Sequence, residues 1–170
     1  MTEPSVHRDA MQSAKPESAR PWLPPRWFVR GAWIVHRAIY RFTGGRRGLW
    51  LPKVGKWGTL RLTTVGRRSG RERSAILGYV EDGPNLVTLA MNGWSAPEPA
   101  WWLNLQAQPD VTVQLADGPR AVRASAADRE ERERLWNRFR AQREWGTDVD
   151  GFATRRPGGT AVVVFEPRQT

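Results

Sequence analysis

Alternating apolar and polar side chains predict two consecutive β-strands in the middle of the chain. Residues 58–65 alternate around Leu60 and Leu62, and an apolar run from Ala75 onward lies in a second predicted strand at 74–81. The residues between these strands are rich in glycine and arginine, which is typical of a hairpin loop. A Glu-Asp-Gly-Pro-Asn turn then leads into a third strand at 85–91, so the three strands are expected to form a meander.

The pattern changes to that of a short helix after the meander. Pro99 suits the first turn of a helix, and the helical segment that follows it stops before Pro109. Alternation returns around Val113, and an Asp-Gly-Pro turn leads into a further strand near 119–125. These features predict a second hairpin.

The last part of the chain predicts one more helix and one more strand. Asp128 and Glu131 form a capping-box pattern at the start of a helix at 129–142. Its apolar residues repeat at helical spacing and are Leu135, Trp136 and Phe139. An irregular stretch at 145–159 follows, and the nearly continuous apolar run at 160–166 predicts a central strand.

These elements together predict an α+β fold that is mainly β. Three strands, a helix, two strands, a helix and a final strand suit a small antiparallel barrel with helices packed outside. A chain of 170 residues has the size of one domain, and it contains no internal repeat at solenoid period. We therefore expect the barrel domain to occupy residues 50–170.

The N-terminal part of the chain differs in pattern from the barrel domain. Residues 1–25 are rich in proline, serine and charge, and we expect them to form a disordered tail. Residues 26–48 are expected to form a basic amphipathic helix and a glycine-rich linker. The arginines of the helix share one stripe and are Arg26, Arg30, Arg37 and Arg41. This stripe fits either a helix packed on the domain or one that contacts anionic lipid.

Composition excludes several kinds of chemistry. The chain has no cysteine, and its two histidines lie far from any acidic cluster, so neither thiolate chemistry nor a metal site is expected. No secretory leader and no run of about 18 apolar residues occurs, so we expect a cytoplasmic protein that is at most peripheral on the inner face of the membrane. The net charge of +10 is compatible with nucleic acid, lipid or a small anion, so the positions of the arginine clusters matter more than the total.

The loop between the first two strands has the composition of an anion-binding site. Gly66 and Gly70 permit unusual backbone conformations and leave main-chain N–H groups exposed. Arg67, Arg68 and Arg73 can form forked hydrogen bonds to phosphate or carboxylate oxygens. A solvated hairpin tip whose arginines aid solubility would have the same composition, so this loop alone leaves both interpretations open.

Three segments that occur in one order distinguish between these interpretations. The hairpin carries a Gly-x-x-Ser-Gly motif at 66–70, the third strand ends in Ala-Met-Asn-Gly-Trp at 90–94, and residues 99–105 read Pro-Ala-Trp-Trp-Leu-Asn-Leu. In this combination the chain resembles the deazaflavin (F420)-dependent nitroreductase family and is quinone-reductase-like, from about Thr59 to Trp136. The resemblance implies a split β-barrel related to FMN-binding, pyridoxamine-oxidase-like folds, with coenzyme F420 as the cofactor and FMN a less suitable one.

The resemblance also implies which residues contact the coenzyme. The hairpin would hold the anionic tail and phosphate, the second and third strands would border the deazaflavin ring, and the short helix would close the site. The residues implied are Arg67, Arg68, Ser69, Arg73, Ser74, Ala75, Ile76, Leu77, Gly78, Leu89, Ala90, Met91, Asn92, Ala100, Trp101, Trp102, Leu103 and Asn104. The tryptophans among them are equally compatible with an ordinary hydrophobic core, because large aromatic side chains dominate protein cores.

The chain departs from the family in the stretch expected to border the substrate. Relatives carry tyrosines between the last helix and the last strand, whereas residues 141–159 contain none and have Trp145 and Phe152 as their only aromatic residues. We expect these two residues to contact the substrate. Tyr79 or solvent would then supply a proton, and the catalytic residue is otherwise not identified.

The function that these features predict is hydride transfer from reduced coenzyme F420 to a flat electrophile such as a quinone, an enone or a nitroaromatic. The coenzyme performs the difficult step, and the protein contributes binding, orientation and exclusion of water. Two alternatives are an F420 or flavin carrier without turnover and a barrel that binds single-stranded nucleic acid. Tryptophans that cluster in one helix argue against nucleic acid as the partner.

Overall fold

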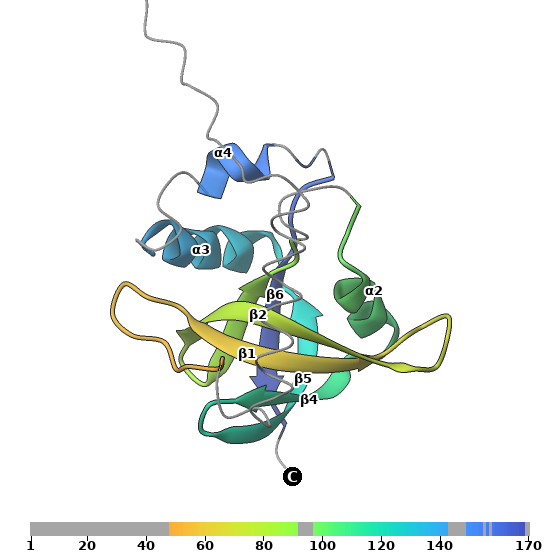
Figure 1. Ribbon diagram of the computed structural model, residues 1–170. Helices are drawn as coiled ribbons and strands as arrows, with labels where there is room; N and C mark the ends of the chain where they lie inside the picture. The colour runs from red at the N-terminus through yellow and green to blue at the C-terminus, as the bar shows by residue number, and fades with distance from the viewer. Residues whose placement is uncertain (1–47, 92–96, 143–148, 155, 157, 169–170) are drawn as a thin grey trace, which may run out of the picture.

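Six β-strands close into an antiparallel barrel in the computed structural model (Figure 1). The strands are β1 (Gly58–Val65), β2 (Glu72–Asp82), β3 (Asn85–Leu89), β4 (Asp110–Leu115), β5 (Gly118–Ala126) and β6 (Val162–Pro167). Their order around the barrel is β1-β2-β3-β6-β5-β4. The predicted mainly β fold is therefore confirmed, including the meander of β1 to β3 and the second hairpin of β4 and β5.

The structure describes residues 48–91, 97–142, 149–154, 156 and 158–168. The predicted tail at 1–25 and the arginine-striped helix lie outside these described residues. The structural account of the protein therefore concerns the barrel, the helices around it and the segment that enters β1.

The strand patterns follow from which faces are buried. Leu60 and Leu62 of β1 point into the barrel and are fully buried, while alternate residues face outward. The last strand lacks such alternation because both of its faces are covered. Val163 and Phe165 lie in the barrel interior, whereas Val162 and Val164 pack beneath the helical layer. The predicted central position of the last strand is thus confirmed, between β3 and β5.

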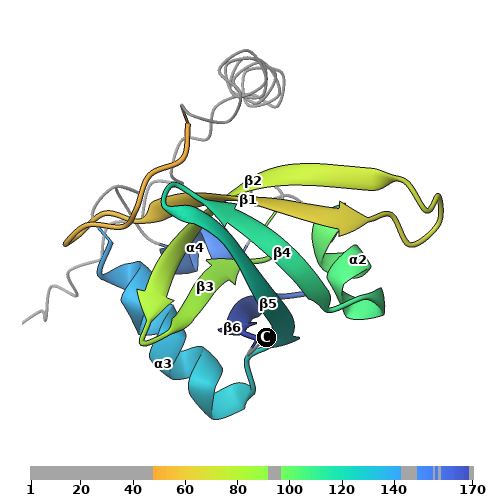
Figure 2. The ribbon, with the colours of Figure 1, turned by 90° about the horizontal axis from the view of Figure 1, so that it is seen from below.

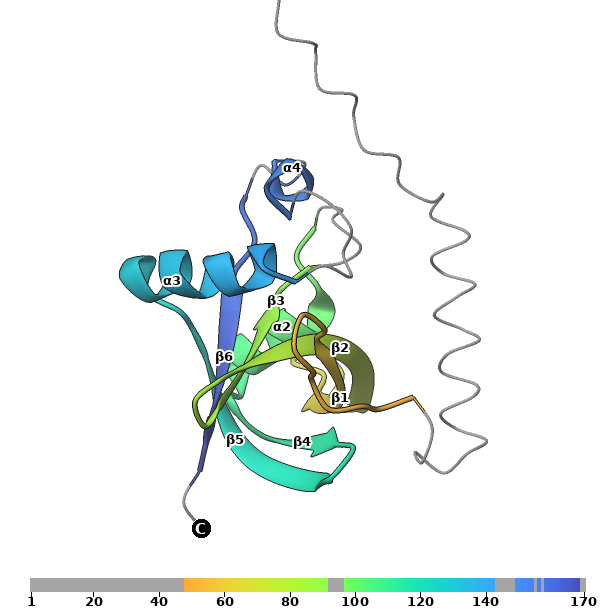
Figure 3. The ribbon, with the colours of Figure 1, turned by 90° about the vertical axis from the view of Figure 1, so that its left-hand side faces the viewer.

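Three helices pack on the outside of the described barrel (Figures 1 and 2). They are α2 (Ala100–Ala107), α3 (Arg129–Arg140) and α4 (Val149–Ala153). α2 packs beside the outer part of β1 and β2 and contributes Trp102 and Leu105 to the interior core. α3 lies over the outer face of β3 and β6, and Figure 3 shows it as a separate layer beside the strands.

The sequence did not predict α4, which falls within the stretch expected to be irregular. The helix has five residues and contains Gly151 at its centre. So short a segment cannot show helical periodicity, and a central glycine disfavours a helix intrinsically. Val149 instead anchors α4 by packing into the core beneath α3, so tertiary contact determines this element.

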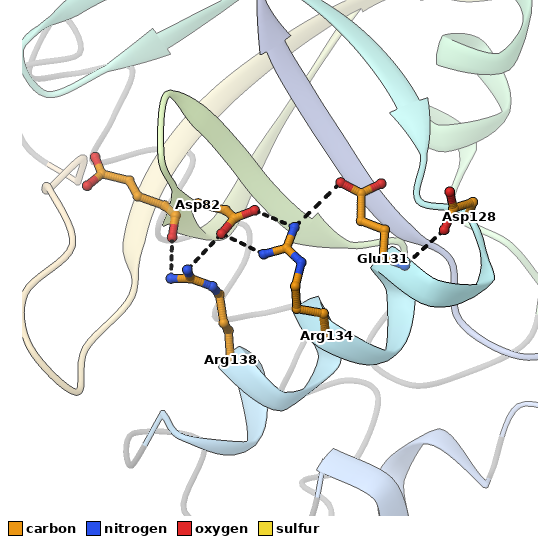
Figure 4. A network of polar contacts seen from close by, with 6 residues as sticks. Asp82, Asp128, Glu131, Arg134 and Arg138 are labelled. Carbon is orange, nitrogen blue, oxygen red and sulfur yellow. Dashed lines mark hydrogen bonds and ion pairs between the residues drawn. The ribbon is translucent and has the colours of Figure 1, made fainter.

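α3 is fastened to the turn between β2 and β3 by an arginine and carboxylate network (Figure 4). The Asp128 carboxylate caps the helix by accepting from the Glu131 N–H at 2.9 Å, which confirms the predicted capping pattern. The Arg134 guanidinium donates to both carboxylate oxygens of Asp82, at 2.9 and 2.7 Å. Arg138 contacts the same carboxylate at 2.7 Å, so two consecutive helical turns are tied to one acidic side chain.

We expect Asp82→Asn to lower the free energy of unfolding by about 1 kcal/mol at neutral pH, because two guanidinium groups lose their carboxylate. Hydrogen bonds from Arg134 lower the pKa of Asp82. The stabilisation is therefore fully present above the unfolded-state pKa of about 4 and is lost as the pH falls through the lower folded-state pKa. Urea unfolding at several pH values would measure the difference between the two proteins.

Asp117→Asn is the matched control for this substitution. Asp117 forms an exposed ion pair with Arg120 three residues away, and such pairs contribute little to stability. Equal losses in the two variants, or a loss at Asp82 that does not diminish as the pH is lowered, would contradict the role of this network.

Candidate functional site

β3 pairs with only the last three residues of β2, and this fork leaves one edge of the earlier part of β2 without a strand neighbour. β1 pairs with residues 72–79 of β2, whereas β3 pairs only with residues 80–82. The Thr88 hydroxyl donates to the Gly78 carbonyl at 2.7 Å where the strands part. From Glu72 to Leu77, the β3-side edge of β2 therefore has no paired strand within the described residues. Such an edge offers free backbone groups to a ligand or another segment.

The arginine hairpin extends beyond the barrel from this edge, and α2 holds its tip (Figures 1 and 2). The Asn104 side chain is 4% exposed and accepts from the Arg67 N–H at 3.1 Å. Its amide donates to the Thr64 hydroxyl at 3.0 Å, and that hydroxyl donates to the Arg73 carbonyl at 3.5 Å. One buried amide therefore links the helix to both arms of the hairpin, which fixes the direction of the tip.

The backbone of the tip is largely occupied by these and local hydrogen bonds. Five tip N–H groups donate to protein acceptors, and they belong to Gly66, Arg67, Ser69, Gly70 and Arg71. In the described part of the chain, the Arg68 N–H is the one tip donor without such an acceptor. The expectation that the glycines leave several N–H groups exposed is thus wrong, because the tight turn consumes them. Gly70 does take the predicted unusual conformation, with φ of 63°.

The side chains of the hairpin remain available for anions. Arg67, Arg68 and Arg73 are exposed, and no salt bridge to them is found within the described residues. Ser69 is exposed at the same tip, and the Ser74 hydroxyl lies 3.1 Å from that of Thr63 across the hairpin. A tip that is fixed in direction and carries unpaired guanidinium groups can bind phosphate or carboxylates through side chains.

The expected ring-binding residues of β2 divide between two faces of the sheet. Leu77 belongs to the interior core and Ala75 packs against it. Ile76 and Gly78 alternate with them toward the outside, and at Gly78 that space is bordered by the Trp57 indole, 3.4 Å from where a Cβ would stand. A flat ligand can contact the side chains of only one face of a strand. The backbone edge, however, is shared by the whole segment.

The expected residues of α2 also serve mainly the core. Trp102 is 5% exposed and belongs to the interior cluster, as its ordinary-core interpretation predicts. Trp101 is half-buried and meets Trp102 edge to face with ring centroids 6.4 Å apart. Leu103 is half-buried and Ala100 is exposed, so these two and Trp101 are the members of the set that retain surface.

A buried arginine that the sequence analysis missed lies at the end of β3. Leu89 packs under α3 and Ala90 is buried in the interior core, while Met91 is half-buried. The Arg156 guanidinium donates to the Ala90 carbonyl, and Arg156 is 5% exposed. Nothing in the local sequence distinguishes this arginine from its many exposed counterparts. Asn92 and Trp145 lie outside the described residues, and Phe152 is placed only as part of the α4 backbone.

The structure buries Tyr79 in the barrel interior, although this residue directly follows Gly78 in β2. Its ring is fully buried in the barrel, and its hydroxyl has no hydrogen-bond partner. Burial, with a smaller contribution from Glu81, raises the pKa of Tyr79 to about 12. Burial and the raised pKa disfavour the role of proton donor that the sequence suggested.

Two further findings concern the described residues only. They contain no group of three histidine, cysteine or acidic side chains that could hold a metal ion. No helix among them is long and apolar enough to cross a membrane.

Comparisons with known proteins place this geometry in a known context. The family model described as F420H(2)-dependent quinone reductase matches residues 33–167. A Mycobacterium tuberculosis protein provisionally named for that activity is 34% identical over 110 residues, which cover 65% of this chain and 90% of the relative. A second protein of that organism, an F420H(2)-dependent quinone reductase, is 34% identical over 105 residues that cover 59% of this chain and 68% of the relative.

A solved structure supports the same comparison. The structure of an F420-H2 dependent reductase superposes with a TM-score of 0.54 at 28% identity and covers 64% of this chain and 93% of its own. The shared part is therefore nearly the whole of that protein.

We expect Asn104→Ala to lower the free energy of unfolding by about 2 kcal/mol, because the buried Thr64 hydroxyl loses the amide it accepts from and the Arg67 N–H loses its acceptor. Amide hydrogen exchange at Arg67 should also become faster, since its N–H loses its acceptor. Asn137→Ala is the control, because Asn137 is exposed on α3 and its loss should change stability by less than about 0.5 kcal/mol. An unchanged exchange rate at Arg67 would show that Asn104 does not hold the hairpin.

Proposed function

This chain belongs to the F420H(2)-dependent quinone reductase family, and we propose that it reduces a quinone at the fork between β2 and β3. It is an oxidoreductase whose cofactor is coenzyme F420. The observation that carries the proposed location is the fixed hairpin with unpaired arginines beside a free strand edge. Enones and nitroaromatics are flat electrophiles that the same site would accept.

The residues of the fork fit this coenzyme. A phosphate and an oligoglutamyl tail are polyanionic, and Arg67, Arg68 and Arg73 present guanidinium groups without protein partners in the described structure. Ser69 and Ser74 add hydroxyl groups on the same hairpin. The tail would lie along the hairpin, and Asn104 would act on it indirectly by fixing the hairpin.

The other end of the free edge would hold the ring and the substrate. Ser74 to Gly78 would border the ring from β2, and Leu89 to Asn92 would border it from β3. Ala100, Trp101 and Leu103 retain surface on α2 and would exclude water there. Trp145 and Phe152 would contact the substrate. The bound reduced coenzyme supplies the hydride, and these residues bind, orient and shield.

Solvent is the proposed source of the proton that completes reduction. Residues 141–159 contain no tyrosine, and the hydroxyl of Tyr79 is buried inside the barrel. A phenol whose pKa is raised to about 12 by burial is also a poor acid at neutral pH. In this proposal, the reaction therefore does not require Tyr79 as a proton donor.

We expect Arg67→Ala combined with Arg68→Ala to weaken binding of coenzyme F420 by several kcal/mol, roughly a hundredfold or more in affinity, with the fold unchanged. The reason is that both side chains are exposed at the tip and contribute little to the core. Titration monitored by tryptophan fluorescence would measure the affinity, and thermal unfolding would verify the fold. Arg120→Ala combined with Arg123→Ala, two arginines on β5, is the matched control.

The same titration separates the alternative functions. FMN should bind less tightly than coenzyme F420 because it lacks the glutamyl tail, and a single-stranded oligonucleotide should not saturate. Unchanged coenzyme affinity in the folded double variant would exclude the hairpin as the tail site. Tighter binding of FMN or of the oligonucleotide would favour a flavoprotein or a nucleic-acid-binding barrel instead.

We also propose that the protein is cytoplasmic and contacts the inner face of the membrane through its N-terminal region. The arginine stripe of residues 26–42 supports this proposal, as does an exposed apolar group in the segment that enters β1. Trp50 and Leu51 are 45% and 40% exposed, and Val54 is fully exposed in the turn between Lys53 and Lys56. Apolar side chains flanked by lysines suit the interface of an anionic bilayer.

Deletion of residues 1–42 should leave coenzyme affinity within about twofold, because the fork lies in the barrel. It should greatly reduce sedimentation with anionic liposomes and slow reduction of a long-tailed quinone more than that of a water-soluble one. Neutral liposomes are the control for the charge requirement. Unfolding of the shortened protein, or equal slowing of both quinones, would assign this region to the domain core or to the pocket.

A further inference from the structure

Arg156 is a buried cation whose backbone and side chain are both held in place. Its N–H donates to the Ala153 carbonyl at 3.0 Å, and its carbonyl accepts from the Gly159 N–H at 2.8 Å. The guanidinium reaches across to the Ala90 carbonyl at the end of β3. The Ala90 N–H in turn donates to the Ala161 carbonyl at 2.9 Å. The segment between α4 and β6 thus presents one fixed positive charge at the end of β3.

The hydrogen bond to the Ala90 carbonyl does not offset the free-energy cost of burying the Arg156 charge. A guanidinium has five N–H donors, and a single neutral carbonyl compensates little of the desolvation cost of a buried cation. No salt bridge to Arg156 is found among the described residues. Arg132 is a useful contrast, because it donates to the Thr160 carbonyl and also stacks over the Trp136 ring at 5.0 Å while remaining half-exposed.

The position of this charge relates it to the fork. Ala90 follows β3 directly, and Thr88 joins Gly78 where the two strands part. The hairpin arginines lie at the other end of the free edge, and the strand from Gly78 to Glu72 spans about 20 Å. The hairpin end therefore carries exposed arginines, and at the other end the buried Arg156 contacts the residue that follows β3. The end with Arg156 is the one at which the proposed reaction takes place.

We propose that Arg156 stabilises the negative charge that develops on a quinone oxygen during reduction, an inference that rests on the proposed function. When bound, the reduced coenzyme would supply a hydride: one of its C–H bonds would break, the hydride would form a bond to the quinone, and the coenzyme would be oxidised by two electrons and release a proton to solvent. The quinone becomes a hydroquinone monoanion, and a proton from solvent completes the hydroquinone. Arginine does not lose its proton near neutral pH, so Arg156 acts by charge and hydrogen bonding in a water-poor setting. It would thereby supply what the missing tyrosines of residues 141–159 cannot.

The test uses two quinones of the same ring size, a hydroxynaphthoquinone that is anionic at neutral pH and a neutral methylnaphthoquinone. Their binding to the full-length protein loaded with oxidised coenzyme F420 is measured by quenching of tryptophan fluorescence. The native protein should bind the anion at least about tenfold more tightly. Arg156→Lys retains the charge and should keep most of this preference. Arg156→Gln retains a donor for the Ala90 carbonyl but removes the charge, and it should abolish the preference.

Two further readouts separate a charge effect from a structural one. In Arg156→Gln, the affinity for the neutral quinone and for oxidised coenzyme should stay within about twofold, while kcat/KM for the neutral quinone should fall on the order of a hundredfold. Arg132→Gln is the matched control, since Arg132 also donates to a backbone carbonyl of this region, and its anion preference should be unchanged.

Several outcomes would overturn the assignment. One is an anion preference that persists in folded Arg156→Gln, and another is an equal loss of this preference in Arg156→Lys. A third is a fall in the affinity of Arg156→Gln for the coenzyme while its affinity for the quinones is unchanged, because Arg156 would then contact the deazaflavin ring. If Arg156→Gln does not fold, the native protein and Arg156→Lys decide the question. An anion preference that both proteins show would support the assignment. A native protein without this preference, or its loss in folded Arg156→Lys, would overturn the assignment. A native protein that binds no coenzyme F420 would instead refute the proposed function.

Discussion

Closure of the barrel through β6 is the constraint on which the site depends. β3 pairs with β2 over only three residue pairs, from Asn85 to Val87, and with β6 over four, from Leu86 to Leu89. β6 is buried on both faces, so its pairing with β3 and β5 joins the interior core to the layer under α3. Because β3 stays paired with β6, it diverges from β2. The part of β2 nearer the hairpin, from Glu72 to Leu77, therefore has one edge free. The fork is therefore a consequence of closing the sheet.

The arginines divide into groups with different physical roles. Arg134 and Arg138 of α3 contact the Asp82 carboxylate and fasten the helix to the barrel. Those at the hairpin tip are exposed and have no protein partner in the described structure, so they remain available to a polyanion. Arg156 is buried and fixed, and its positive charge interacts more strongly with a nearby negative charge because little water is present to screen it. The total charge of +10 would not distinguish these groups, whereas burial and pairing do.

Two buried polar side chains determine the shape of the fork, and neither needs to touch a ligand. Asn104 holds the hairpin through Arg67 and Thr64, while Thr88 bridges to Gly78 where β2 and β3 part. A buried amide or hydroxyl that lost its partner would be costly, so these contacts resist bending of the edge. The arginine-bearing tip is thus held in place by α2.

The sequence by itself determined the strands, the longer helices and the mainly β class. Alternation around Leu60 and Leu62 indicates a strand with one buried and one more exposed face, and the apolar run of β6 indicates a strand that is buried on both faces. The combination of the hairpin with the Trp-Trp helix also identified the family and its coenzyme. These properties are local, because they depend on the order and spacing of side chains along the chain.

Only the tertiary structure decided which polar groups are buried or hydrogen-bonded within the protein and which remain available to a ligand. It buried Tyr79 inside the barrel, used the tip N–H groups in the turn, formed α4 around Val149 and brought Arg156 to the Ala90 carbonyl, 66 residues away. The same residue type is exposed at position 67 and buried at position 156. The physical reason is that burial and hydrogen bonding depend on residues distant in sequence, whose approach no local pattern records.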